Sequence, residues 1–244
     1  MRNVLFIIDP QNDFVDPKGS LYIPGAEKAI DEICKVIENE NPRNIIITQD
    51  THQAYHIGHP GYWKNNPTPF TKITLEDINL GKYEPKYSYS KKNIINYIND
   101  LPDKTHTIWP EHCIEGSWGW AFPEKLINAL KKWQLKNSGK SYKIIQKGFD
   151  IHHEMYSAFT RIDNRGMNLK SNTNLKMLSR FDKIMVSGFA KDVCVAWSVV
   201  DMYASGMFFN KLEFLNNCMT ELNPKSELLD IFETCIKDQG AIWK

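Results

Sequence analysis

Side chains that can do chemistry follow several short apolar runs of this sequence. They comprise two carboxylates, two histidines, one lysine and one cysteine: Asp9, Asp50, His52, His112, Lys147 and Cys194. An ionisable group directly after an apolar run is costly to bury unless it has a partner. The pattern therefore predicts that these groups meet and partner one another where the runs end.

The spacing of Asp50 and His52 suggests a metal site. In an extended segment, residues two apart face the same side, so this carboxylate and this imidazole point together. His112 offers a third ligand, and two histidines with one aspartate suit a catalytic zinc, manganese or iron ion with open positions. A simple ion pair between Asp50 and His52 is the alternative.

Cys194 is the cysteine that we expect to react. A helical pattern begins around it, and the partial positive charge at a helix start favours a thiolate. The alternative is an inert, buried cysteine. Asp9 taken alone also fits a turn aspartate, and Lys147 an exposed lysine. Cys113 follows His112 and lies off the helix start, so we expect it to serve packing.

The elements that position these residues predict an α/β fold. Apolar runs at 4–8, 44–48, 106–109, 142–146 and 183–187 are typical of buried parallel strands, and 211–215 is a weaker sixth. Helical patterns cover 25–37, 124–133 and 194–203, and an N-cap and first-turn proline at 223–224 precede another. We expect one domain over 1–244, with three layers, a doubly wound and mostly parallel sheet of about six strands, and helices on both faces.

The carboxyl ends of parallel strands meet at one edge of such a sheet, which is where ligands bind. Five strand ends then bring the reactive and metal-binding residues to the same edge. This coincidence favours a functional site over the non-functional interpretation of each residue taken alone. Residues 53–104 interrupt the alternation of strands and helices. We interpret them as a long insertion over the active-site edge, because connections of this length are usually functional or disordered.

Composition excludes several classes of protein. The 244 residues carry a net charge of +1 with no basic stripe, so we expect neither nucleic acid nor a membrane as a partner. The N-terminal apolar run is too short for a signal peptide. Five widely spaced cysteines without a C-x-x-C favour a reduced, cytoplasmic setting. No G-x-G-x-x-G follows the first strand, which argues against a nucleotide cofactor.

The motifs resemble the isochorismatase-like cysteine hydrolases, and among them the nicotinamidase branch. The matching segments occur in the family's order and cover nearly the whole chain: 6–14, 50–52 with His56, 109–114, 147–149, 156–159 and 188–195. The resemblance implies a catalytic triad of Asp9, Lys147 and Cys194. In it, Asp9 takes the thiol proton and later returns it to the leaving ammonia, while Lys147 lowers the thiol pKa.

The resemblance also implies how the substrate is held. The backbone N–H groups of Ala190 and Cys194 would form the oxyanion hole, beside a cis peptide between Phe189 and Ala190. A divalent metal would bind Asp50, His52 and His112 and orient the substrate ring, with zinc as the first choice and iron or manganese as alternatives. Phe14 would pack on the ring, and Tyr156 would line the pocket. We further expect a small amide substrate and a homo-oligomer.

Departures from the family pattern concern the substrate pocket and not the triad. The family usually has Ser and Phe where this chain has Gly58 and His59, and threonine where it has Lys191. The leading hypothesis is hydrolysis of nicotinamide to nicotinate and ammonia. Hydrolysis of another small amide or a carbamoyl compound is the alternative. A non-catalytic binding protein on the same fold is a third hypothesis, and it is disfavoured because every triad residue is present.

Overall fold

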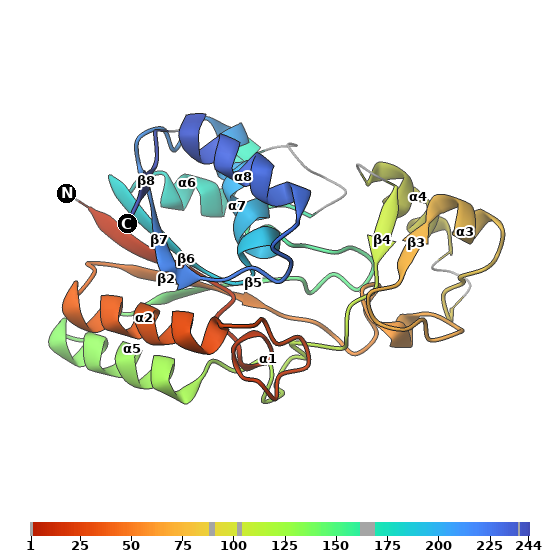
Figure 1. Ribbon diagram of the computed structural model, residues 1–244, viewed down its shortest axis with the longest axis horizontal. Coiled ribbons are helices and arrows are strands. Elements are labelled where there is room, and N and C mark those ends of the chain that lie inside the picture. The colour runs from red at the N-terminus through yellow and green to blue at the C-terminus, as the bar shows by residue number, and fades with distance from the viewer. Residues whose placement is uncertain (1, 88–90, 102–103, 162–168, 239) are drawn as a thin grey trace.

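The computed structural model describes residues 2–87, 91–101, 104–161, 169–238 and 240–244. Its centre is a parallel sheet with the strand order β5-β2-β1-β6-β7-β8 (Figure 1). The strands are β1 (Asn3–Ile8), β2 (Ile45–Asp50), β5 (Lys143–Lys147), β6 (Lys183–Gly188), β7 (Leu212–Met219) and β8 (Ile242–Trp243). The predicted α/β class, with a mostly parallel sheet of about six strands, is confirmed.

Central strand β1 shows why the sheet is covered on both faces. Its residues 4–8 are all fully buried, and alternate side chains enter two different hydrophobic clusters. Val4, Phe6 and Ile8 pack with α6 (Thr173–Leu178), α7 (Ala196–Ser205) and α8 (Glu227–Asp238). Leu5 and Ile7 pack with α2 (Ala26–Asn39) and α5 (Glu124–Lys136) on the opposite face (Figure 1).

One predicted strand is misplaced, and one strand of the main sheet was not predicted. The run at 106–109 does not join the main sheet: β4 (Thr105–Thr107) pairs antiparallel with β3 (Lys72–Thr74). His106 and Ile108 are both buried there. A short apolar run therefore predicts that a strand is buried, but not which sheet the strand joins. The sixth strand of the main sheet is β8 instead. Strand β5 lies at the opposite edge, and its Ile144 is 40% exposed.

The predicted insertion at 53–104, together with the strand that follows it, forms a folded lobe with a core of its own. It holds β3, β4, a 3-10 turn η1 (Pro60–Tyr62), α3 (Leu75–Asn79) and α4 (Lys91–Asp100), and lies beyond one edge of the main body (Figure 1). Buried Trp63, Tyr97 and Ile98 belong to its hydrophobic cluster, which shares no residue with the two clusters of the sheet. The assignment of 1–244 to one domain with an insertion stays a prediction.

The helix start predicted at 223–224 is wrong. Asn223 instead closes a turn, accepting the backbone N–H of Lys225 at its side chain (3.0 Å) and that of Ser226 at its carbonyl (3.0 Å). Helix α8 therefore begins three residues after Pro224. The remaining short elements are α1 (Asn12–Val15), η4 (Leu169–Ser171) and η5 (Lys191–Val195). In the described ranges, no helix has the length and apolar character needed to cross a membrane.

Candidate active site

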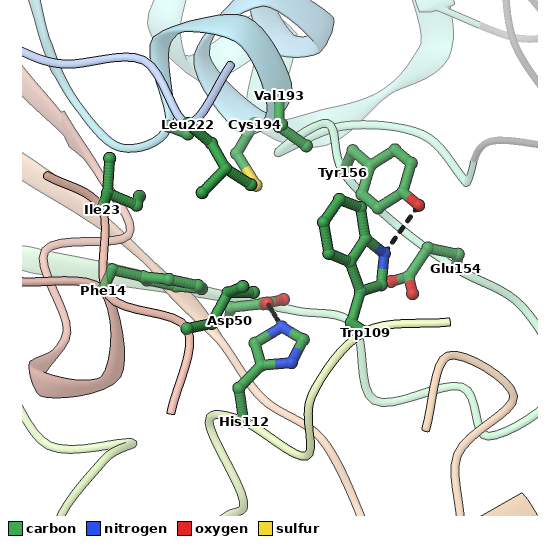
Figure 2. A pocket seen from close by; sticks show the side chains of 12 residues that line it. Phe14, Ile23, Asp50, Trp109, His112, Glu154, Tyr156, Val193, Cys194 and Leu222 are labelled. Atoms are coloured by element: carbon green, nitrogen blue, oxygen red, sulfur yellow. Dashed lines mark hydrogen bonds and ion pairs between the residues drawn. The ribbon is translucent and has the colours of Figure 1, made fainter. Parts of the chain in front are cut away.

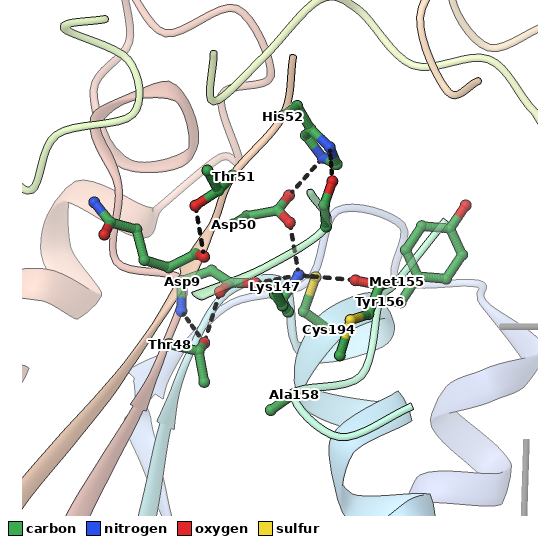
Figure 3. A network of polar contacts seen from close by, with 12 residues as sticks. Asp9, Thr48, Asp50, Thr51, His52, Lys147, Met155, Tyr156, Ala158 and Cys194 are labelled. Carbon is green, nitrogen blue, oxygen red and sulfur yellow. Dashed lines mark hydrogen bonds and ion pairs between the residues drawn. The ribbon is translucent and has the colours of Figure 1, made fainter. Parts of the chain in front are cut away.

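Three separate elements bring Asp9, Lys147 and Cys194 together at the carboxyl edge of the sheet. Asp9 follows β1 with a positive φ of 47°, Lys147 ends β5, and Cys194 lies in the π-helical turn η5 between β6 and α7. The Lys147 Nζ atom lies 3.0 Å from Asp9 Oδ2 and 3.6 Å from Cys194 Sγ (Figure 3). Lys147 thus reaches across β2 to join the acid of β1 with the thiol.

Further contacts fix the orientation of these groups. The Thr48 hydroxyl donates to Asp9 Oδ1 (2.6 Å) and accepts the Asp9 backbone N–H (3.0 Å). Lys147 also donates to Asp50 Oδ1 (2.9 Å) and to the Met155 carbonyl (3.1 Å) (Figure 3). The buried ammonium is therefore surrounded by acceptors, which is the condition for keeping its charge away from water.

Burial controls the protonation of the three groups. It raises the pKa of Asp9 above its usual range, with Lys147 acting in the opposite direction. Burial would lower the pKa of Lys147, but the carboxylates of Asp50 and Asp9 hold it well above its usual range. Burial also raises the pKa of Cys194 far above normal, and Lys147 opposes this only in part. Burial therefore favours the neutral thiol at Cys194, whereas the Lys147 ammonium favours the thiolate.

Asp50, His52 and His112 converge as a set of potential metal ligands. One donor atom from each lies within 4.8 Å of the others, and all three residues are buried. His52 Nε2 is 3.0 Å and His112 Nε2 3.5 Å from Asp50 Oδ2. The Nδ1 atoms of both rings face backbone carbonyls at 2.8 Å and so carry the protons. Both Nε2 lone pairs are then left for an ion, as in metal sites with carbonyl-oriented histidines.

Glycine at position 148 allows this set to form. Its φ is +79°, and a Cβ atom there would lie 2.6 Å from Asp50 Oδ1 and 2.9 Å from His52 Cε1. The carbonyl that orients His52 belongs to the same residue. A side chain at this position would therefore displace two of the three ligands.

His112 reaches the site by a route that the sequence did not indicate. It does not follow a strand of the main sheet but lies in an extended segment beside the end of β2. There the His52 backbone N–H donates to the Cys113 carbonyl (3.0 Å), and His52 pairs in parallel with Ile114. The structure thus places all the predicted ligands together, although the predicted position of one strand was wrong.

The thiol and the ligand set open on the same pocket. Its polar lining is Asp50, His112, Glu154 and the Cys194 thiol, and apolar and aromatic residues complete it (Figure 2). The others are Phe14, Leu21, Ile23, Trp109, Tyr156, Ala190, Val193 and Leu222. Phe14 and Tyr156, the two residues predicted to contact the substrate, both line this pocket. The Phe189–Ala190 peptide bond is cis, as the resemblance implies.

Comparisons with known proteins agree with this geometry. No protein-family model matches the chain. The nicotinamidase of Saccharomyces cerevisiae is 27% identical over 195 residues, covering 78% of this chain and 76% of the relative. The nicotinamidase of Acinetobacter baylyi is 28% identical over 206 residues, covering 83% and 75%.

Solved structures show the same fold. The yeast nicotinamidase Pnc1p bound to the inhibitor nicotinaldehyde superposes with a TM-score of 0.70 at 22% identity, covering 99% of this chain and 98% of that one. A Pyrococcus horikoshii pyrazinamidase in complex with zinc gives 0.57 at 18% identity, covering 100% and 99%. These similarities support placing the chain in the nicotinamidase branch of the isochorismatase-like proteins. The zinc-bound neighbour and the Asp–His–His cluster together suggest that a metal ion binds here.

Glu154 is a pocket residue that the sequence analysis missed. Its side chain is buried, burial raises its pKa above the usual range, and its Oε2 atom has no hydrogen-bond partner. Gly58 makes room for it, because a Cβ atom on Gly58 would lie 2.5 Å from Glu154 Oε2. One signal was present: Glu154 stands two residues before Tyr156, so in an extended segment both face the same side.

Two of the departures from the pattern of the nicotinamidase branch, Lys191 and His59, have different outcomes. The Lys191 side chain lies over the Trp243 ring of β8, 5.2 Å from its centroid, and does not line the pocket. His59, in contrast, is fully buried beside the ligand set, with Nε2 3.4 Å from His112 Nδ1. Burial lowers the pKa of His59 to about 2 and that of His56 well below its usual range, so both rings are neutral.

Proposed function

We propose that this protein is a metal-dependent amidase that hydrolyses nicotinamide to nicotinate and ammonia. The observation that carries the proposal is the position of Lys147, which contacts Asp9, Cys194 and Asp50 beside the pocket that Cys194, Asp50 and His112 line. The sequence relatives from yeast and Acinetobacter baylyi, both named nicotinamidases, support a small amide as the substrate.

Cys194 would act as the nucleophile and Asp9 as the acid–base group. Asp9 takes the thiol proton while the sulfur bonds to the amide carbon, and the oxyanion faces the backbone N–H groups of Ala190 and Cys194. Asp9 then protonates the nitrogen, the C–N bond breaks, and ammonia leaves a thioester. Water attacks the thioester as Asp9 accepts its proton, and the thiolate recovers that proton when the C–S bond breaks.

The protonation behaviour of the site suits this cycle. A carboxyl whose pKa is raised by burial returns a proton more readily than an ordinary aspartate, so Asp9 can serve in both directions. Lys147 remains charged throughout because two carboxylates hold its pKa high. Its ammonium stabilises the thiolate only while that anion exists, which favours the transition state over the resting thiol.

Asp50, His52 and His112 would hold a divalent ion, which we propose to be zinc. Imidazole nitrogen and carboxylate oxygen are ligands that zinc accepts, and the zinc complex of the P. horikoshii pyrazinamidase supports this choice. When bound, the ion would act as a Lewis acid that attracts the ring nitrogen of the substrate. Phe14 lies with its ring centroid 5.6 Å from that of His112, where it can pack against the same ring.

Hydrolysis of a different amide or of a carbamoyl compound is the second candidate. The presence of Glu154 in the pocket favours it, because a buried carboxylic acid is a hydrogen-bond donor that an amine, carbonyl or hydroxyl group on a larger substrate would satisfy. Gly58 and His59, which depart from the family pattern, lie beside this residue and the ligand set.

We further propose a cytoplasmic location and a homo-oligomer. All five cysteines are free, which suits a reducing compartment. Met202 is buried in the core and so is no interface residue, whereas Tyr203 is 41% exposed. Apolar side chains at the β8 edge, Ile242 (64% exposed) and Trp243 (41%), offer a surface for a second copy. Light scattering on purified protein would test the oligomer, and a monomeric mass would contradict it.

The test of the main proposal is ammonia release from nicotinamide by purified, zinc-loaded protein. Turnover that disappears in Cys194→Ala would support it. A panel of small amides and carbamoyl compounds, assayed in parallel, separates the two candidates. Absence of nicotinamide turnover in metal-loaded protein, with turnover of a panel member, would replace the first candidate by the second.

A further inference from the structure

A second group of histidines lies beside the Asp50–His52–His112 set. His52, His56 and His59 each place a ring nitrogen within 4.8 Å of the others, and all three are buried. Their ring centroids are 4.2 Å (His52–His56), 5.1 Å (His52–His59) and 5.3 Å (His56–His59) apart. His52 therefore belongs to both groups.

Two nitrogens of this second group lack partners. His56 Nε2 and His59 Nδ1 are buried and have no hydrogen bond. A buried polar atom without a partner is destabilising by about 1–3 kcal/mol, so native proteins usually satisfy such atoms or use them at a site. Neutral imidazole is also the form that binds metals.

We propose that His52, His56 and His59 form a second position for a divalent transition metal ion. Zinc–nitrogen bonds are about 2.1 Å long, so the rings rotate inward when all three bind one ion. Because the His52 imidazole is common to both sets, one ion occupies either the Asp50–His52–His112 position or this one. Three imidazoles without a carboxylate favour zinc, cobalt, nickel or copper over manganese.

Glu154 supports this second position from outside. Its unpartnered Oε2 and His56 Nδ1 border the same point, since a Cβ atom on Gly58 would lie 2.5 Å from the first and 3.2 Å from the second. In the metal-free protein His56 Nδ1 accepts the Gly58 backbone N–H (3.2 Å), so binding of an ion through Nε2 requires the ring proton to move to Nδ1, where a carboxyl oxygen of Glu154 can accept it. Carboxylate–histidine–metal units of this kind orient the ring and strengthen the ligand.

The two positions differ in their access to substrate. Asp50 and His112 line the pocket that holds the thiol, whereas His52, His56 and His59 do not. An ion in the second position is therefore withdrawn from the pocket while it remains bound to the protein. Binding of a metal ion at the second position does not depend on the proposed amidase activity.

Cobalt(II) binding to metal-free protein tests the inference, with no substrate present. His112→Asn removes a ligand of the first position only. We expect this variant to bind one Co2+ within about tenfold of the wild-type affinity, with X-ray absorption showing three imidazole ligands. Adding His59→Phe, which restores the ring of the family pattern, should weaken binding at least about a hundredfold.

A matched control uses His153→Phe in the same His112→Asn background. His153 is a half-buried histidine outside both sets, and its replacement should leave Co2+ affinity unchanged. Circular dichroism establishes that each variant is folded, and Asp50→Asn replaces His112→Asn if the latter is not. A folded first-position variant that binds no Co2+, or equal affinities with and without His59→Phe, would overturn the inference.

Discussion

The ammonium of Lys147 lies 2.9 Å from Asp50 Oδ1, so the lysine beside the thiol is also paired with a carboxylate of the candidate metal set. Its second ion pair, to Asp9 at 3.0 Å, completes a buried chain from the metal set to the acid–base group. The nucleophile and the ion position are thus parts of one electrostatic unit.

Replacement of the nucleophile should separate Cys194 from its buried neighbour Cys113. Cys194→Ser is expected to lower kcat/KM for the amide substrate by about 1,000-fold or more, because a hydroxyl is a far weaker nucleophile in this setting. Cys113→Ser should stay within about tenfold of wild type, since that thiol does not line the pocket. Ammonia release measures both, and equal losses would refute the assignment.

Gly148→Ala should damage the metal set specifically. Its new Cβ would lie 2.6 Å from Asp50 Oδ1, so we expect metal affinity to fall about 10- to 100-fold. Gly139→Ala is the matched control: φ is +75° there against +79° at Gly148, but no atom lies within 4 Å of the new Cβ. Both variants should lose about 1–2 kcal/mol of stability through backbone strain.

Calorimetric metal titration and thermal unfolding distinguish these two effects. Only Gly148→Ala should lose both affinity and activity, while the two melting temperatures fall by similar amounts. Equal metal affinity in the two alanine variants would show that the close approach at Gly148 is not needed to form the set.

Removal of the metal should lower the turnover of nicotinamide more than it lowers the reactivity of the Cys194 thiol. Chelation is expected to lower kcat/KM for nicotinamide, because the ion is assigned to hold the ring. Cys194 should still react with iodoacetamide at a rate within about threefold of the loaded protein, since Asp9 and Lys147 contact it without the ion. Mass spectrometry of the alkylated peptide provides the measurement. Loss of alkylation together with activity would place the ion in the activation of the thiol.

Acid should destabilise the protein through His106 of the lobe. Burial lowers its pKa from 6.5 to about 4, and it contacts Tyr97 Oη (3.2 Å) and the Ile57 carbonyl (3.0 Å) as a neutral ring. The unfolded chain then binds a proton below pH 6.5 that the folded chain does not bind until about pH 4. The free energy of unfolding is therefore expected to fall by about 3 kcal/mol as the pH is lowered from 6.5 to about 4.

Urea unfolding of wild type and His106→Gln at pH 7 and pH 4.5 measures this effect. The wild type should lose more stability between the two values than the variant, which has no group to titrate at this position. Parallel losses in both proteins would assign the acid sensitivity to other groups.

The strand ends were predictable because burial and chemistry coincide there. Runs such as 4–8 have no polar residue for either face, which is typical of a central parallel strand, and the residue that follows must then lie at the sheet edge. Asp9, Asp50, Lys147 and Cys194 can be placed at this edge in the same way, without knowledge of the strand order. It fails for β8, because two exposed residues carry no periodicity.

The parts that could not be predicted depend on contacts between distant segments. His112 occupies its position because residues 108–114 return from the lobe to the end of β2, which no local pattern encodes. The effect of burial on the Cys194 thiol could not be predicted either, because complete burial depends on the surrounding tertiary structure and not on the local helix start. Glu154 was missed because a carboxylate without a partner is not an expected feature of an apolar pocket.

Separate hydrophobic cores have a consequence for how this molecule can diversify. The catalytic groups stand at the carboxyl edge of the sheet, whereas Trp109, one wall of the pocket, lies two residues after β4, where the chain leaves the lobe and packs against a sheet cluster. The lobe cluster shares no member with the sheet clusters, so substitutions within it can accumulate without loosening the strands that hold the thiol. Changes in the lobe can therefore shift the Trp109 wall of the pocket, and selection can act on that wall while the strands that hold the thiol stay constant.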